Sequence, residues 1–430
     1  AEFCRRVHRV PFLVCVRGLH NLGVILIQAG VLAGLLGIIP CCDFSPSRLH
    51  LHQYYHRRMR FPSYDQLQAR NTMKWTRYGA DVLPLWVAES DFVTCPAVVD
   101  AVQAAVSAES FGYPAENQSG LAEATADFYQ DRYGFAARPE WVHPVADVVR
   151  ALLISIEHFT TPGSKVIVPV PAYPPFFQLL QATGREGIFV ESFDLGELRQ
   201  AFAQGAGCLL LCNPYNPLGF VFGREELVGI TDLAAEFGAR VLVDEIHAPL
   251  VYDGRQHVVA AGVSETAARV CITATATSKA WNTAGLKCAQ IIFSNADDER
   301  VWQGLTNATK DGASILGLVA AEAAYRSGRE FLDAELEYLQ ANRDFLVAEL
   351  PNALPGVKLQ VPEATYLLWL DLSETDIPGN KATYLLEHAK VAVNDGAWFG
   401  EIGADCVRLN FATSREILHQ ALTRIASMRK

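Results

Sequence analysis

Short apolar runs alternate with helical patterns through the middle of the chain. Between residues 99 and 325, strand-like runs recur at 166–170, 208–212, 240–244, 270–276 and 289–294. Such alternation is typical of a mostly parallel sheet covered by helices. We therefore predict an α/β fold with a large domain over 99–325.

The pattern changes near the C-terminus. Residues 329–350 show helical spacing and predict one long amphipathic helix. Three strand-like runs and a closing helix follow, at 357–361, 365–370, 405–412 and 414–428. These elements predict a small α+β domain, separate from the central sheet and built from both chain ends, 59–98 and 326–430.

Polar groups stand at the carboxyl ends of three of the apolar runs. Lys279 follows 270–276, Asp244 ends 240–244, and Asn216 lies just after 208–212. Ligands bind at this end of the strands in an open α/β sheet. Taken alone, these residues fit a surface lysine, a helix cap and a turn. Together they predict a site, because a desolvated lysine becomes nucleophilic and forms Schiff bases.

The charge is unevenly distributed and leaves an acidic body. The chain carries −11; residues 1–58 hold seven Arg and two acids, or about +5, so the remainder carries −16. An acidic body argues against nucleic acid and anionic membranes as partners. The ten cysteines form no CxxC pair, which favours free thiols in a reducing cytoplasm. No spacing of His, Cys and carboxylates indicates a metal site.

Residues 22–39 are apolar apart from Gln28 and follow a basic stretch. Their length and flanks fit a marginal transmembrane helix or a signal segment. The other interpretation, which we favour, is upstream translation or a cloning remnant, because ordinary globular sequence begins at Met59. We therefore treat 1–58 as an extension outside the catalytic fold and expect no membrane role for 59–430.

Longer blocks around these residues resemble the pyridoxal-phosphate (PLP) enzymes of the class I/II aminotransferase superfamily, which have fold type I. The resemblance covers 59–430 and is strongest to the cystathionine β-lyase branch typified by MalY and PatB, especially actinobacterial C–S lyases. Its carriers are Lys74-Trp75, 83–92, 244–250, 278–286 and 365–371. The resemblance implies a large domain with a mostly parallel seven-stranded sheet, plus a small α+β domain.

The resemblance also implies how PLP is held. Lys279 would bond covalently to the cofactor. Asp244 would pair with the pyridine nitrogen and keep it protonated, so that the ring accepts electron density. Asn216 would hydrogen-bond the ring oxygen, Tyr173 would stack on the ring face, and His247 would be a further cofactor contact.

The phosphate group would lie at a predicted helix start, where backbone N–H groups and the helix dipole favour anions. Its contacts would be Val148, Val149, Thr277, Ser278 and Lys287. Lys287 replaces an Arg that is common in the superfamily, and Asp147 replaces a common Gly; we expect Asp147 to turn out to solvent. Tyr113 resembles a Tyr that reaches the phosphate of the neighbouring subunit, which implies a homodimer with shared active sites.

The substrate is expected to be a small amino acid. By the same resemblance, Arg408 would hold its α-carboxylate bidentately, and the backbone of Ala88 would face that carboxylate. The pocket wall would include Trp281, Tyr366 and the loop 395–398.

Two reactions remain open from the fold. Both begin when the substrate displaces Lys279 and the freed amine removes the α-proton. His247 stands where many aminotransferases carry Tyr, and no second Arg for a dicarboxylate is evident. We therefore predict C–S β-elimination from cystathionine and other S-substituted L-cysteines, giving a thiol, pyruvate and ammonia, with aminotransfer as the alternative.

A purely regulatory binding role is disfavoured by the intact catalytic set. A DExH helicase is disfavoured because the sequence has no P-loop.

Overall fold

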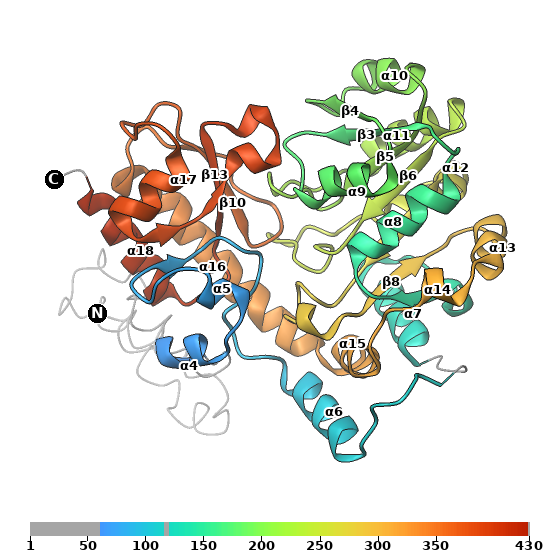
Figure 1. Ribbon diagram of the computed structural model, residues 1–430, viewed down its shortest axis with the longest axis horizontal. Coiled ribbons are helices and arrows are strands. Elements are labelled where there is room, and N and C mark those ends of the chain that lie inside the picture. The colour runs from blue at the N-terminus through green and yellow to red at the C-terminus, as the bar shows by residue number, and fades with distance from the viewer. Residues whose placement is uncertain (1–60, 116–119, 429–430) are drawn as a thin grey trace, which may run out of the picture. The chain divides into compact units, whose positions relative to one another are not determined.

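A seven-stranded sheet lies at the centre of the computed structural model, which describes residues 61–115 and 120–428 (Figure 1). In spatial order the strands are β2 (Val142–Val145), β8 (Ala289–Ile292), β7 (Cys271–Thr275), β6 (Arg240–Asp244), β5 (Ala206–Cys212), β3 (Lys165–Pro169) and β4 (Gly187–Val190). β8 runs antiparallel to β2 and β7, and the other pairings in this sheet are parallel. Every residue of β5 and β7 is buried, so both faces of the sheet are covered. The predicted α/β class and mostly parallel sheet are confirmed.

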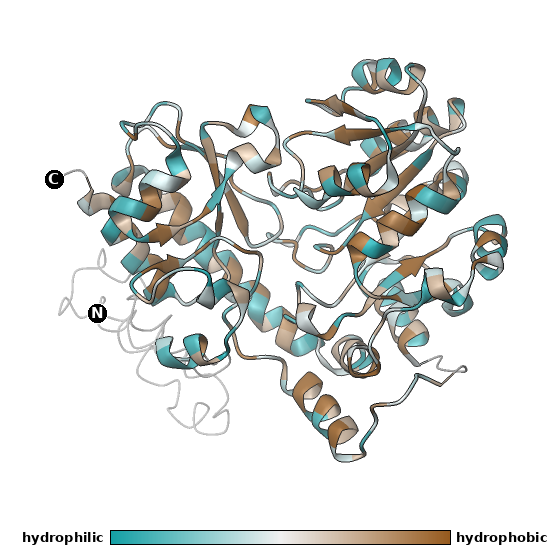
Figure 2. Ribbon diagram, in the orientation of Figure 1, coloured by the Kyte–Doolittle hydropathy of each residue, from teal (hydrophilic) through white to brown (hydrophobic). Residues whose placement is uncertain are grey.

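Helices cover the sheet in two groups, as right-handed crossovers require. Along the chain, successive strands are added in one direction across the sheet from β2 to β4 and in the opposite direction from β5 to β7. The connecting helices therefore change from one face of the sheet to the other after β4. One face carries α8 (Val148–Phe159) and α9 (Pro175–Thr183); the other carries α10 (Leu195–Ala203), α11 (Arg224–Glu236) and α12 (Glu265–Val270) (Figure 1). The strands are hydrophobic, whereas the covering helices carry hydrophilic residues as well (Figure 2).

Further helices pack along the β2–β8 side of the molecule or extend from it (Figure 1). They are α6 (Pro96–Ser107), α7 (Gly120–Tyr133), α13 (Ala296–Gly304), α14 (Asn307–Lys310) and α15 (Ile315–Ser327). Helix α15 packs against both α6 and α7. Short polar side chains begin several helices; for example, Ser314 accepts the N–H of Gly317 at the start of α15.

A second, antiparallel sheet forms from the C-terminal part of the chain. Its order is β12 (Asn394–Asp395), β13 (Cys406–Asn410), β10 (Leu367–Asp371) and β9 (Lys358–Leu359). It is accompanied by α16 (Arg329–Ala353), α17 (Lys381–Tyr384) and α18 (Arg415–Ser427). The parallel pair β1 (Leu83–Pro84) and β11 (Val391–Ala392) joins the N-terminal segment, with α4 (Tyr64–Ala69) and α5 (Met73–Thr76), to this region. The boundaries 98/99 and 325/326 remain predictions.

None of the helices in 61–115 and 120–428 combines the length and hydropathy needed to cross a membrane. The same ranges hold no group of three His, Cys, Asp or Glu side chains placed to share a metal ion. The apolar segment 22–39 lies outside the described residues.

Candidate active site

The predicted strand-end residues converge on one edge of the central sheet. The register pairs Cys212 of β5 with Asp244 of β6, and Asp244 with Ala274 of β7. Asn216 and Lys279 follow β5 and β7 by four residues each. Because neighbouring parallel strands end together, three polar side chains reach the same place from three segments.

Lys279 is the basic centre of this edge. Its Nζ donates to the backbone oxygen of Ala88 at 2.8 Å. Burial, and after it the nearby charge of Arg408, lowers the pKa of Lys279 from 10.5 to about 8, while the charges of Asp244 and Glu89 oppose the shift. A large fraction of the amine is therefore neutral near pH 8, as a nucleophile or a base requires.

Asp244 lies buried at the bottom of the site. Burial raises the pKa of its carboxyl group from 3.8 to about 6, although the N–H of Ile246, which donates to Oδ1 at 3.0 Å, lowers it. Above pH 6 it is a carboxylate in a dry environment. Such a group binds a protonated ring nitrogen strongly.

Arg408, on β13, brings a buried guanidinium to the same edge. Nη1 donates to Asn216 Oδ1 at 2.9 Å, Nη2 donates to Asn394 Oδ1 at 2.6 Å, and the group stacks 4.8 Å from the Phe399 ring centroid. Burial lowers the pKa of Arg408 to about 10. No carboxylate within the described residues forms an ion pair with it. A buried cation without a counter-ion favours an anionic ligand.

The contact with Arg408 also orients the Asn216 amide. A guanidinium only donates hydrogen bonds, so the amide oxygen must face it and the Nδ2 group becomes the available donor. Asn216 can therefore donate to an acceptor such as a ring oxygen.

Tyr173 and His247 complete the surroundings of Asp244 and Lys279. Burial, followed by the charge of Asp244, raises the pKa of Tyr173 to about 12, so it stays a neutral phenol. Burial, with Lys279 and Arg408 nearby, holds the pKa of His247 well below its usual value. The imidazole is neutral, and its buried Nδ1 has no hydrogen-bond partner.

Tyr366 and Ala88 meet beside the amine. The Tyr366 hydroxyl donates to the Ala88 oxygen at 3.0 Å, so this carbonyl accepts from Tyr366 and Lys279 together. Burial raises the pKa of Tyr366 well above its usual value. Of the residues predicted for the substrate side, Ala88 thus contacts Lys279 directly and Tyr366 shares its acceptor.

The predicted phosphate end carries a charge pair of its own. Asp147 caps α8 by accepting the N–H of Arg150 at 2.8 Å, and its other oxygen pairs with Lys287 Nζ at 2.9 Å. Asp147 is partly exposed but stays at the helix start, because a carboxylate there satisfies an N–H that lacks a partner within the helix. Val148 and Val149 open α8. The hydroxyls of Thr277 and Thr283 bond to each other at 2.8 Å, and Ser278 is half-buried.

Two predicted residues lie elsewhere. Trp281 is in the hydrophobic core, where its ring packs on Phe128 and Tyr325 and its Nε1 donates to the oxygen of Gly328 at 2.9 Å. Its polar atom is therefore already satisfied, which corrects the expectation that it lines the pocket. Tyr113 is fully exposed within this chain.

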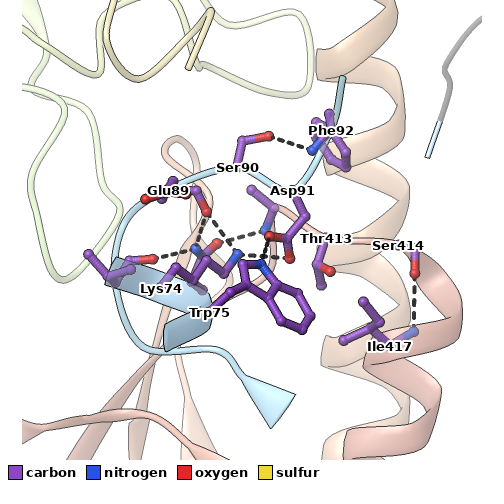
Figure 3. Close-up of polar contacts among 12 residues, drawn as sticks. Lys74, Trp75, Glu89, Ser90, Asp91, Phe92, Thr413, Ser414 and Ile417 are labelled. Atoms are coloured by element: carbon purple, nitrogen blue, oxygen red, sulfur yellow. Dashed lines mark hydrogen bonds and ion pairs between the residues drawn. The ribbon is translucent and has the colours of Figure 1, made fainter. Parts of the chain in front are cut away.

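Several contributors were given no role from sequence. Asn394 holds Arg408, and Asn410 donates from Nδ2 to the oxygens of Val87 and Glu89 at 2.6 and 2.8 Å. Asn410 lies two residues after Arg408 on β13, so both project from the same face, a spacing that could have indicated it. Lys74 and Asp91 form a buried ion pair beside the segment 87–89 that Asn410 contacts (Figure 3).

The donor set fits PLP. A buried carboxylate, an amine of lowered pKa and an uncompensated guanidinium stand together, and His247 Nδ1 and Arg408 Nε lack hydrogen-bond partners. An anionic, ring-shaped ligand would satisfy these groups. At the phosphate end, the Asp147 carboxyl group lies beside Lys287 and caps α8, so the two share that position.

Comparisons with known proteins agree with this geometry. The Aminotransferase class I and II family matches residues 80–425. A cystathionine beta-lyase of Corynebacterium glutamicum is 56% identical over 372 residues, 86% of this chain and 100% of that protein. Cystathionine beta-lyase PatB of Bacillus subtilis is 31% identical over 85% of this chain and 99% of its own length.

A solved structure from Corynebacterium diphtheriae, to which PLP-dependent beta-cystathionase activity is ascribed, has 61% identity and a TM-score of 0.84. The match covers 86% of this chain and 98% of that one. The family match and these relatives span nearly all of the residues that carry the site. The chain belongs to the aminotransferase class I and II family, within its cystathionine β-lyase branch.

Proposed function

We propose that this chain is a PLP-dependent carbon–sulfur lyase. It cleaves cystathionine and other S-substituted L-cysteines by β-elimination, giving a thiol, pyruvate and ammonia. The observation that carries the proposal is the Lys279 amine, with a pKa near 8, beside Asp244 and the uncompensated Arg408. The 56% identity to a cystathionine beta-lyase supports elimination, whereas the aspartate aminotransferases among the relatives share only 24% and 26%.

The cofactor would be held by the groups at the sheet edge. Lys279 would bind its aldehyde, Asp244 its ring nitrogen, Asn216 its ring oxygen and Tyr173 its face. When bound, PLP supplies an electron sink that stabilises negative charge on the substrate α-carbon. His247, held neutral by burial, would contribute a hydrogen bond without adding charge. The start of α8, Thr277, Ser278 and Lys287 would hold the phosphate.

Lys279 would move the protons. Its lowered pKa lets the free amine accept the α-proton near neutral pH, and the resulting ammonium can protonate the departing sulfur. The Ala88 oxygen, 2.8 Å from Nζ, would hold the amine between these two steps. One residue would thus serve as base and then as acid.

Arg408 would bind the substrate α-carboxylate. Nη1 donates to Asn216, Nη2 donates to Asn394 and to the Trp86 backbone oxygen, and the buried Nε has no hydrogen-bond partner. The guanidinium therefore has donors left for a carboxylate, and the stack on Phe399 limits its rotation.

We also propose a homodimer with shared active sites. Phe111 and Tyr113 are exposed large side chains, at 64% and 100%, and Val99 and Val106 of the neighbouring α6 are exposed as well. Exposed apolar groups of this kind favour burial against a partner. A cytoplasmic location is supported by the six cysteines of the described residues, which are all buried free thiols. The acidic charge disfavours nucleic acid as a partner.

The test mixes the PLP-loaded protein with L-cystathionine and follows pyruvate and free thiol. We expect both products in equal amounts, and none from a Lys279→Ala variant. Exchange of amino groups with a keto acid, without pyruvate or thiol, would instead establish the aminotransferase alternative.

A further inference from the structure

Residues 86–91, here called the strap, pass alongside the Lys279 amine without forming a helix or strand. Five successive strap carbonyls each accept a hydrogen bond from a side chain. The donors to residues 86 to 90, in order, are Arg408, Asn410, Lys279 with Tyr366, Lys74 with Asn410, and Asn282. A backbone outside regular structure must find such partners when it is buried. Side chains therefore set where the strap lies.

Lys74, on α5, donates a hydrogen bond from its side chain to a backbone carbonyl of the strap. Its side chain is fully buried; Nζ lies 2.8 Å from Asp91 Oδ2 and donates to the Glu89 oxygen at 2.9 Å. Trp75, the next residue, donates from Nε1 to Asp91 Oδ1 at 2.7 Å. Figure 3 shows Lys74 and Trp75 both directed at the Asp91 carboxylate. Trp75 thus hydrogen-bonds one carboxylate oxygen, and Lys74 forms an ion pair with the other, which has no hydrogen-bond partner, so the charge is neutralised inside the protein.

The strap is tied to α5 at its other end too. The Trp86 Nε1 donates to the Lys74 backbone oxygen at 3.2 Å. Lys74 and Trp75 therefore contact the strap at residues 86, 89 and 91. Ala88, whose oxygen accepts from Lys279, lies between these points and has no side chain beyond Cβ to fix it.

We propose that Lys74 and Asp91 are a positioning pair that places the Ala88 oxygen against the Lys279 amine and so sets the proton affinity of that amine. This inference rests on the proposed function, in which Lys279 is the base. A carbonyl held 2.8 Å from the amine stabilises its charged form. The charges of Asp244 and of Glu89, which belongs to the strap, also favour the charged form, whereas burial and Arg408 oppose it. If the strap shifts, this stabilisation weakens, and the amine becomes less basic and less well directed.

The main test variant is Lys74→Met/Asp91→Asn. It removes both charges together, so no unpaired charge stays buried, and the Asn oxygen can still accept from Trp75. The matched control is Arg240→Met/Asp298→Asn. That pair is also largely buried, at 17% and 5% exposure, but it stands at the opposite end of β6 from Asp244.

The first readout needs no turnover. The pH dependence of Lys279 modification by a neutral amine reagent is followed by mass spectrometry on the full chain without PLP. We expect a midpoint near 8 in the wild type, and a midpoint lower by about one pH unit in the Lys74→Met/Asp91→Asn variant. In this variant Asn410 and Asn282 still hydrogen-bond the strap and hold it over the site, so water does not reach the amine. The loss of the Ala88 acceptor therefore determines the direction in which the midpoint shifts.

The second readout uses the PLP-loaded enzyme with L-cystathionine. We expect kcat to fall about tenfold with KM changed less than about threefold, because the base is displaced while Arg408 still binds the carboxylate. The control should lose a similar amount of thermal stability yet keep both the midpoint and kcat. A Trp75→Phe variant, which keeps both charges, should shift the midpoint in the same direction by a smaller amount, and it remains usable if the double variant does not fold.

Three results would overturn the inference. They are an unchanged midpoint in both strap variants, a midpoint raised towards that of an ordinary lysine, or an equal shift in the control. A raised midpoint would mean that Lys74 and Asp91 act only by keeping water away from Lys279. Wild-type enzyme that releases no pyruvate would overturn the proposed function instead, and the labelling midpoint would still decide the role of the pair.

Discussion

Replacing Arg408 with lysine tests whether the buried guanidinium recognises the substrate carboxylate. In the wild type, Arg408 reaches Asn216 and Asn394 with different nitrogens, at 2.9 and 2.6 Å, and still has donors left. A lysine keeps the positive charge but has a single nitrogen with three N–H groups. It cannot bridge both amides and also bind a carboxylate with two parallel hydrogen bonds.

The magnitude follows from the number of bonds lost. A hydrogen bond to a charged group contributes about 1.5–3 kcal/mol. Losing one of two such bonds to the carboxylate, while keeping the charge, lowers kcat/KM by roughly 10- to 100-fold. Most of the loss should appear in KM if the bond is equally strong in the ground state and the transition state.

The assay is steady-state release of pyruvate from L-cystathionine by PLP-loaded protein. Arg343→Lys is the matched control, because Arg343 also makes a two-pronged contact, to Asp253 at 2.6 and 2.9 Å, and stacks 5.1 Å from the Tyr252 ring centroid. That control should keep kcat/KM at temperatures where it is folded. A kcat/KM of Arg408→Lys within about threefold of wild type would refute the carboxylate assignment.

Four further substitutions probe other parts of the site. Lys279→Met should abolish activity yet raise the unfolding free energy of PLP-free protein at pH 7 by up to about 3 kcal/mol, because burial depresses the lysine pKa from 10.5 to about 8. The penalty is full below pH 8 and disappears as pH rises through 10.5, so denaturant titrations showing the same gain at pH 7 and 11 would contradict this origin. Lys287→Ala should weaken PLP binding about tenfold at low salt, and Asp147→Asn should tighten it severalfold, with both effects reduced at high salt. Titration of the cofactor, followed by visible absorbance, checks this. Equal effects at low and high salt would argue against a charge contact with the cofactor. Trp281→Phe should cost about 1–3 kcal/mol of stability, through the lost bond to Gly328, with little change in kcat/KM; a large rise in KM without loss of stability would return Trp281 to the pocket.

The central strands were predictable because burial on both faces leaves a plain signal. The predicted runs 208–212, 240–244 and 270–276 agree with β5, β6 and β7 to within two residues at each end. The edge strands were not predicted. β2 reads Val-His-Pro-Val and β4 is only half-buried, so neither shows a continuous apolar run.

The strand-end residues were predictable for a related reason. Once the strands are parallel neighbours, Asn216, Asp244 and Lys279 must lie near one another, whatever their side chains touch. Trp281 was misplaced because only its distance along the chain from Lys279 was known. The Trp281 N–H donates to the Thr277 oxygen at 3.0 Å, and the ring packs on Phe128 and Tyr325 in the core.

The contacts that hold these groups join residues far apart in sequence. Arg408 and Asn216 are 192 positions apart, and Lys279 and Ala88 are 191 apart. Local pattern carries no information about such pairs. Lys74 and Asp91 are closer in sequence, but a lysine on a short helix gives no sign that it is fully buried.

The electrostatics of the site indicate why the surrounding structure is so extensively hydrogen-bonded. Burial removes hydration from Lys279, Asp244 and Arg408. It shifts the pKa of each group in the direction that favours the neutral form. In the absence of a ligand they destabilise the fold, so neighbouring groups must hold them in place. Two amides hold Arg408, and a strap with five engaged carbonyls holds Lys279. The same desolvation that costs stability gives Lys279 a pKa near 8, at which one amine can both take and return a proton.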